Sequence, residues 1–249
     1  MRLRLVPSAL VVGTLAPDFW YFLGLESQSG LGHTFHGAFV FTPPLALIVL
    51  WLFHAFVKTP FTSLLPDTVQ SRLASHPSRF RFGGPTRLAM ILGSILLGIA
   101  THLLWDSFKH PTTWLYSHWA FLSYMVRLPI VGLVPYYRLF QHGSTIVGTA
   151  ILLVWLARWY QRTEPCHRDF RPSLSSRQKL SLIVLICLVA ILGAVARSVV
   201  IVGAPMDSLA LKRFAGQAIV SVIALAWWEL VALGLLYSIR QSTKSPTNY

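Results

Sequence analysis

Residues 88–106, LAMILGSILLGIATHLLWD, are the stretch of sequence that decides the fold. The run from Leu88 to Trp105 carries no formal charge and ends at Asp106. About 20 apolar residues in a row cross the hydrocarbon layer of a bilayer as an α-helix. A helix in water could not keep so long an apolar surface hydrated, so the stretch predicts a transmembrane helix.

Four further stretches have the same character, at 36–57, 144–161, 180–203 and 216–238. A sixth stretch, at about 5–25, is weaker because Pro7 and Pro17 interrupt it and Asp18 lies inside it. Two arginines before a short apolar core also resemble a signal peptide. The proline that follows Ala16 disfavours cleavage there, so we favour an uncleaved helix.

The composition agrees with a membrane protein. The chain has 249 residues, of which 54% are hydrophobic and 12% charged, whereas a soluble domain has roughly 25% charged residues. This excludes disordered chains, free-standing nucleic-acid binders and secreted disulfide scaffolds, and the two cysteines form no framework. We therefore predict an all-α, polytopic integral membrane helical bundle of five or six transmembrane helices. A single membrane domain would cover 1–239, with a polar tail at 240–249.

The basic residues predict the orientation. The net charge is +13, and cytoplasmic loops of membrane proteins are enriched in Lys and Arg. Five of these residues lie in 58–87 and six in 158–179, and the tail adds Arg240 and Lys244, whereas the intervening loops hold fewer. These regions and the C-terminus are therefore expected in the cytoplasm. Membrane lipid is the expected partner, and no nucleic acid is.

Histidine and aspartate residues gather at the opposite, outer face. Successive spans alternate in direction, so the start of one span, the end of the next and the start of the third share one side. Ionisable groups are costly within a bilayer, so their positions mark candidate functional sites. The residues that meet at this face are Asp18, His33, His102, Asp106, His110 and His142.

The spacing of His102 and Asp106 suits a metal site, because positions i and i+4 share a helix face. Imidazole and carboxylate ligands together suit Zn²⁺, Mn²⁺ or Fe²⁺, and an open position on such an ion makes a bound water nucleophilic. A structural reading remains open for the same residues. His102 and Asp106 would then be a buried structural pair, Asp18 a helix cap, and the other histidines interfacial.

The outer loop 111–141 is rich in aromatic residues and proline. It predicts one or two short interfacial helices that cover the site or act as a lid. His118, Arg127 and Arg138 are then available to bind an anionic headgroup. His54, on the cytoplasmic side, is expected at the surface.

The motifs and their order resemble the bacterial membrane family called domain of unknown function 4184. They are SALVVGTLAPDF at 8–19, GHT at 32–34, THLLWDSFKHP at 101–111 and QHGST at 141–145. A more distant similarity is to predicted membrane-bound metal-dependent hydrolases. That similarity implies metal ligation by Asp18, His33, His102 and Asp106, whereas His110 and His142 match only the closer family. Family members usually begin with a further segment bearing a Ser-His-Pro motif, and this chain starts after that point.

These observations together predict a metal-dependent hydrolase of the bacterial inner membrane, acting on lipid phosphoesters. A divalent Zn, Mn or Fe ion would be the cofactor. His110 and His142 would act as a further ligand, orient the other ligands or transfer protons in catalysis. The alternatives are a non-enzymatic metal-binding or transport protein and a structural membrane protein. A pore is disfavoured because 88–101 offers only Ser94 and Thr101 as polar residues.

Overall fold

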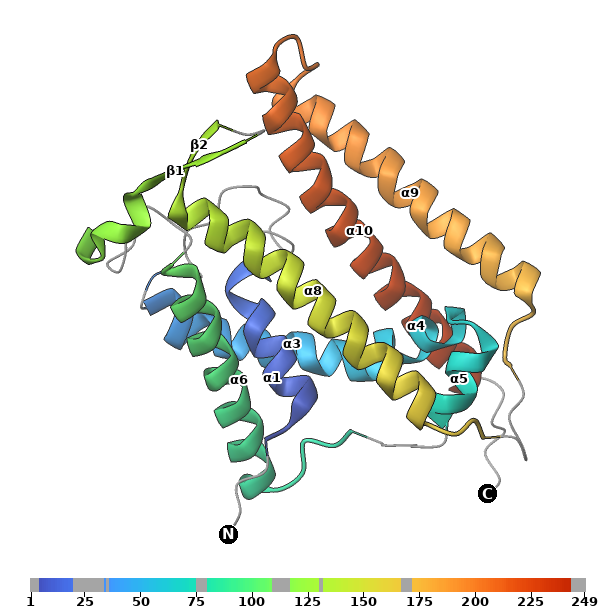
Figure 1. The fold of residues 1–249 in the computed structure, drawn as a ribbon. Helices are drawn as coiled ribbons and strands as arrows, with labels where there is room; N and C mark the ends of the chain where they lie inside the picture. Colours follow the sequence, from blue (N-terminus) through green and yellow to red (C-terminus); the bar gives the residue numbers. More distant parts are fainter. Residues whose placement is uncertain are drawn as a thin grey trace, which may run out of the picture.

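The computed structural model describes residues 5–19, 34, 36–74, 80–108, 117–129, 132–166 and 172–242. Within these residues the chain is largely helical, which confirms the predicted fold class (Figure 1). Five helices are long and apolar enough to cross a membrane. They are Gly37–Leu64, Pro85–Asp106, Tyr136–Arg162, Ser176–Val202 and Ser208–Arg240.

The first of these five helices is continuous but not uniform. It consists of the π-helix η3 (Gly37–Phe41), α3 (Thr42–Leu52), the π-helix η4 (Phe53–Val57) and α4 (Lys58–Leu64). Two prolines follow Thr42 and lack the N–H groups that would continue an α-helical ladder. The Thr42 hydroxyl donates instead to the Gly37 carbonyl at 2.8 Å, which supports the wider turn.

The weak N-terminal stretch forms a short helix, α1 (Pro7–Leu15), followed by the 3-10 turn η1 (Ala16–Asp18). It packs closely along α6 (Pro85–Asp106). A Cβ added to Gly98 would lie 2.5 Å from the Leu10 carbonyl oxygen, and one added to Gly13 would overlap the backbone of Ile95. Glycine at both positions therefore lets the two backbones touch.

The buried core lies where α1, α3 and α6 meet. Ile91, Ile95 and Ile99 of α6 are fully buried, as are Ala46 and Leu50 of α3. The backbone N–H of Val6, at the start of α1, donates to the Ser94 hydroxyl at 2.9 Å. Ser94 is itself fully buried, so a side chain inside α6 satisfies a donor at the end of α1 that would otherwise have no intrahelical partner.

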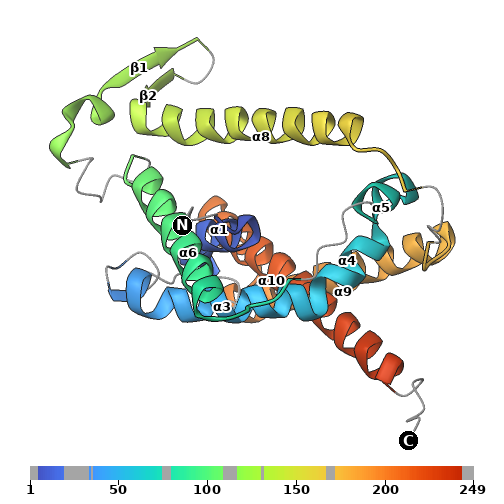
Figure 2. The same ribbon diagram turned by 90° about the horizontal axis from the view of Figure 1, so that it is seen from below.

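The helices α9 (Ser176–Val202) and α10 (Ser208–Ser242) pack against each other as a hairpin. The buried Lys179 of α9 forms an ion pair with Asp67 of α5 (Asp67–Ala74). From α5, Arg72 donates to the Tyr160 carbonyl at 2.9 Å and lies over the Tyr160 ring. These contacts join α5 to α9 and to the C-terminal end of α8 (Tyr136–Arg162) at one end of the molecule (Figure 2).

The described part of the outer loop, residues 117–129 and 132–135, contains a β-hairpin that the sequence did not predict. Its described part holds a 3-10 turn, η5 (Ala120–Ser123), and a hairpin of β1 (Met125–Leu128) and β2 (Gly132–Pro135). The strands are antiparallel, with Val126 opposite Val134. Leu122 and Val134 are buried, so this small hairpin has a shielded side.

The helix α8 (Tyr136–Arg162) begins directly after β2 and stands apart from the other long helices (Figure 2). None of its residues is buried. In this respect α8 differs from α6, which contributes much of the core.

Candidate functional site

His102 is the centre of a polar group at the C-terminal end of α6. Its Nδ1 lies 2.8 Å from the Thr14 carbonyl oxygen. A carbonyl can only accept, so Nδ1 carries the proton and donates. The other ring nitrogen, Nε2, lies 3.1 Å from Oδ2 of Asp106 and 3.9 Å from Oδ1 of Asp18.

The parallel packing of α1 on α6 brings these groups together. The contacts Val6–Ser94 and Thr14–His102 both join residues 88 positions apart, so the two helices run side by side in a constant register. Asp18 and Asp106 are separated by the same interval, 106 − 18 = 88. Two parallel segments therefore each end in an aspartate, and Nε2 of His102 lies within 4 Å of an oxygen of each carboxylate. We call Asp18, His102 and Asp106 the carboxylate–imidazole triad.

The triad is only partly shielded from the surroundings. The side chains of His102 and Asp106 are 15% and 11% exposed, whereas that of Asp18 is 38% exposed. The His102–Asp106 pair is thus held in place by packing within α6, and Asp18 is the accessible member.

The other predicted site residues divide into two groups. His33 and His110 lie outside the described residues. His118, Arg127, Arg138 and His142 are exposed, on the outer loop and on the first turns of α8. Among the described residues, Arg127, Arg138 and His142 form no hydrogen bond or ion pair with the triad.

Thr14 is the contributor that sequence reasoning missed. Thr14 contributes its backbone carbonyl to the site. Every residue has such a carbonyl, so the amino-acid type at position 14 does not indicate this role. One signal was available, because Thr14 and Asp18 are four residues apart, as His102 and Asp106 are. The equal spacing is what two parallel helices in register would have.

His54 also lies elsewhere than expected. Its ring stacks on that of Phe80 with centroids 3.9 Å apart, and Nε2 is 3.2 Å from the Ser8 hydroxyl. It is therefore a half-buried packing residue near the start of α1 and not a surface histidine.

No group of three or more His, Cys, Asp or Glu side chains within the described residues is arranged to hold a metal ion. The triad supplies one short donor pair and a third donor at a longer distance. His33, the fourth ligand expected from the sequence, cannot be placed.

The helices and the arrangement of the triad define a polytopic α-helical membrane protein with a polar group at one end of its bundle. The chain belongs to the family described as domain of unknown function, DUF4184, whose model matches residues 1–235. No curated protein and no solved structure matches the chain. The similarity to membrane-bound hydrolases therefore stays a prediction.

Proposed function

We propose that the carboxylate–imidazole triad binds one divalent metal ion and that the protein is a metal-dependent hydrolase. The orientation of His102 carries this proposal, because Nδ1 is committed to the Thr14 carbonyl and Nε2 faces two carboxylates. Histidine ligands of metals usually donate their second ring N–H to a carbonyl or carboxylate, and this leaves a lone pair for the metal.

The separations between the donor atoms also support a shared ion. Two donors that bind one Zn²⁺ at about 2.0–2.2 Å lie roughly 3.0–3.5 Å from each other. The 3.1 Å between His102 and Asp106 fits this range. Asp18, at 3.9 Å, would need to move by roughly 0.5 Å to join them, and it is the most exposed of the three.

A bound divalent ion would act here as a Lewis acid and as an activator of water. The chain's own residues would have separate tasks. The two carboxylates would balance the charge of the ion, and the Thr14 carbonyl would keep the His102 ring in place. We include His33 as a further ligand, and His110 and His142 as proton-transfer groups.

The proposed substrate is a phosphoester of a lipid. His118, Arg127 and Arg138 are exposed cations or hydrogen-bond donors on the outer loop and α8, and such groups bind phosphate oxygens. The distribution of Lys and Arg supports a place in the bacterial inner membrane, with the triad on the outer side and the C-terminus in the cytoplasm.

The same contacts support a second, structural candidate. A doubly protonated His102 would bridge Asp18 and Asp106 without any metal, and the three residues would then fasten α1 to α6. Both candidates predict that the triad stabilises the fold, so stability alone does not separate them. Metal content does.

The experiment is elemental mass spectrometry on protein purified in detergent without chelators. We expect about one Zn, Mn or Fe ion per chain in the wild type. The metal content of the double variant His102→Gln/Asp106→Asn should be lower than that of the wild type by about 10-fold or more. His54→Gln is the matched control, because it alters a half-buried histidine at the other end of α1, and its metal content should equal that of the wild type.

Wild-type protein that stays free of Zn, Mn and Fe after incubation with each ion would overturn the metal proposal and favour the structural candidate. If metal is found, release of inorganic phosphate from phosphatidic acid in mixed micelles tests the activity. A chelator should abolish the release, and restoring the ion should recover it. Bound metal without any release would favour a non-enzymatic metal-binding protein.

A further inference from the structure

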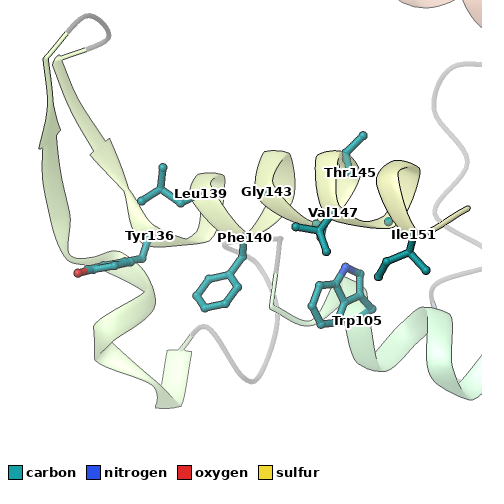
Figure 3. Close-up of a pocket in the computed structure, with 10 residues that line it drawn as sticks. Trp105, Tyr136, Leu139, Phe140, Gly143, Thr145, Val147 and Ile151 are labelled. Carbon is teal, nitrogen blue, oxygen red and sulfur yellow. The ribbon is translucent and has the colours of Figure 1, made fainter. Parts of the chain in front are cut away.

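Two cavities of the bundle differ in the charge of their lining. The larger, of about 750 Å³, lies open between Trp105 of α6 and the first turns of α8, and none of its described lining residues is charged (Figure 3). The smaller has a volume of about 350 Å³, which is within the range of about 300–1,000 Å³ that is usual for ligand sites. It is lined by α4, by the start of α9 with the residues before it, and by the last turns of α10. We call this smaller cavity the α4–α9–α10 pocket, and these segments lie together in Figure 1.

One face of α10 forms a wall of the pocket. Its lining residues are Leu233, Leu236, Tyr237 and Arg240. These are positions i, i+3, i+4 and i+7 of one helix, so they lie on a single face. The helix rises by about 10.5 Å over the seven residues from Leu233 to Arg240. The α10 wall is therefore apolar at one end of the pocket and carries an arginine at the other.

The α9 wall follows the same order. A Cβ added to Gly193 of α9 would meet the side chain of Leu225 of α10 at 2.8 Å, which gives the register of this antiparallel pair. Leu182 lies 11 residues before Gly193, and Leu236 lies 11 residues after Leu225, so these two lining leucines are at the same level. Ser173 precedes α9 and lines the pocket on the Arg240 side. The leucines thus gather at one end and polar groups at the other.

Contacts beside each end of the pocket hold its walls in place. At the polar end, the Leu65 carbonyl, next to the lining residue Leu64, accepts from Lys179 Nζ at 3.1 Å and from Gln70 Nε2 at 2.7 Å. This joins the first turn of α9 to the end of α4. At the leucine end, a Cβ added to Gly234 would overlap the Phe56 carbonyl, so the backbone of α10 touches η4. The pocket is therefore part of the folded bundle and not a gap along an unpacked helix.

The charge at the polar end is positive. Among the described lining residues Arg240 is the charged one, and none is acidic. A guanidinium has five N–H donors and can bind a phosphate through two of them at once. Lys179, beside the pocket, is already neutralised by its ion pair with Asp67. The N-terminal end of α9, which begins at Ser176 just after the lining segment, adds a favourable dipole for an anion.

We propose that the α4–α9–α10 pocket binds one anionic phospholipid, with its phosphate at Arg240 and the first part of an acyl chain against the leucines. Basic pockets between membrane helices bind anionic lipid headgroups in this way. A soluble phosphate ester would leave the leucine end unfilled, and a zwitterionic lipid would bring its own cation to the arginine. The inference goes beyond the proposed function and does not rest on it, because the pocket contains no residue of the triad.

The test is native mass spectrometry of the delipidated, detergent-purified protein, titrated with phosphatidylglycerol or with phosphatidylcholine of the same acyl chains. Each bound lipid adds a resolved mass, so the association constant of the first lipid can be compared between the two. We expect phosphatidylglycerol to bind about 10-fold more tightly, a ratio worth about 1.4 kcal/mol. Equal association constants of the two lipids in the wild type would mean surrounding lipid only and would overturn the proposal.

Two arginine variants make the headgroup test specific. Arg240→Gln should abolish the preference for phosphatidylglycerol, because it removes the charge that binds the phosphate. Arg162→Gln is the matched control, since Arg162 is an exposed arginine in the last turn of α8 and does not line the pocket. It should keep the wild-type preference. An unchanged preference in Arg240→Gln, or an equal loss in both variants, would contradict the proposal.

A second pair of variants tests the cavity itself. Ser63→Phe places a ring at a lining position of α4 and should weaken the binding of phosphatidylglycerol about 10-fold, since roughly two methylene groups of lost contact are worth that much. Ser238→Phe, at an exposed position of α10 that does not line the pocket, is the control. Wild-type affinity in a folded Ser63→Phe protein would overturn the proposal. If that variant does not fold, the exposed Arg240→Gln change still decides.

Two further arms separate the lipid from other ligands and the pocket from the triad. Excess glycerol 3-phosphate should not displace phosphatidylglycerol, and displacement would identify a soluble phosphate ester as the occupant. The double variant His102→Gln/Asp106→Asn should keep the wild-type affinity, and a loss of affinity would place the lipid at the triad instead. Either of these contrary results would overturn the proposal.

Discussion

The α1–α6 pair and α8 differ in how closely they pack against the rest of the bundle. At the α1–α6 interface, glycine brings two backbones into contact and hydrogen bonds link the helices at Ser94 and His102. Along α8 no residue is buried, and two glycines face open space. The molecule therefore joins a closely packed pair, which positions the triad, to a loosely attached helix beside it.

The largest expected effect comes from breaking the close packing. Gly98→Ala would place a Cβ 2.5 Å from the Leu10 carbonyl oxygen, and such overpacking costs about 1–3 kcal/mol or more. Gly93→Ala, on the same helix but with nothing within 4 Å, is the control. Thermal unfolding in detergent should show a clear loss for Gly98→Ala and none for Gly93→Ala. Equal behaviour of the two variants would mean that α1 does not press on α6.

A smaller effect is expected from the hydrogen bond inside the apolar layer. Ser94→Ala removes the acceptor of the Val6 N–H and should destabilise the protein by about 1–2 kcal/mol. Ser144→Ala is the corresponding change on α8, where the hydroxyl bonds only within its own helix, and it should be close to neutral. Thermal unfolding in detergent measures both variants. A larger loss of stability for Ser144→Ala than for Ser94→Ala would mean that α8 contributes more to stability than the α1–α6 interface does.

The smallest effect is expected on α8 itself. Gly148→Ala adds a methyl group where there is open space, so the free energy of unfolding should change by no more than about 0.5 kcal/mol. Urea titration of the detergent-solubilised protein measures this. A loss comparable to that of Gly98→Ala would show that another surface covers α8 in the assembled protein.

The transmembrane helices of the bundle can be predicted from the sequence because an apolar run long enough to cross a bilayer can do little else than form a helix there. Pro85–Asp106 closely matches the predicted span. The ends of other helices were less predictable: α8 begins at Tyr136, well before the predicted start at 144, because hydrophobicity marks the part of a helix within the bilayer and not the turns that extend beyond it. The β1–β2 hairpin was missed because its strands are short and their alternation is weak.

The site was predictable in part for a geometric reason. Alternating spans bring Asp18, His102 and Asp106 to one face, and the structure has them in contact range. The Thr14 carbonyl was not predictable, since its role depends on the register between α1 and α6.

The short length of α1 has a consequence for how the protein is made. Nine helical residues rise about 13.5 Å, less than half of the roughly 30 Å hydrocarbon layer. The partner that satisfies its first backbone donor lies 88 residues later in the chain. During synthesis α1 must therefore wait near the membrane until α6 emerges, and the triad can form only after that late docking step.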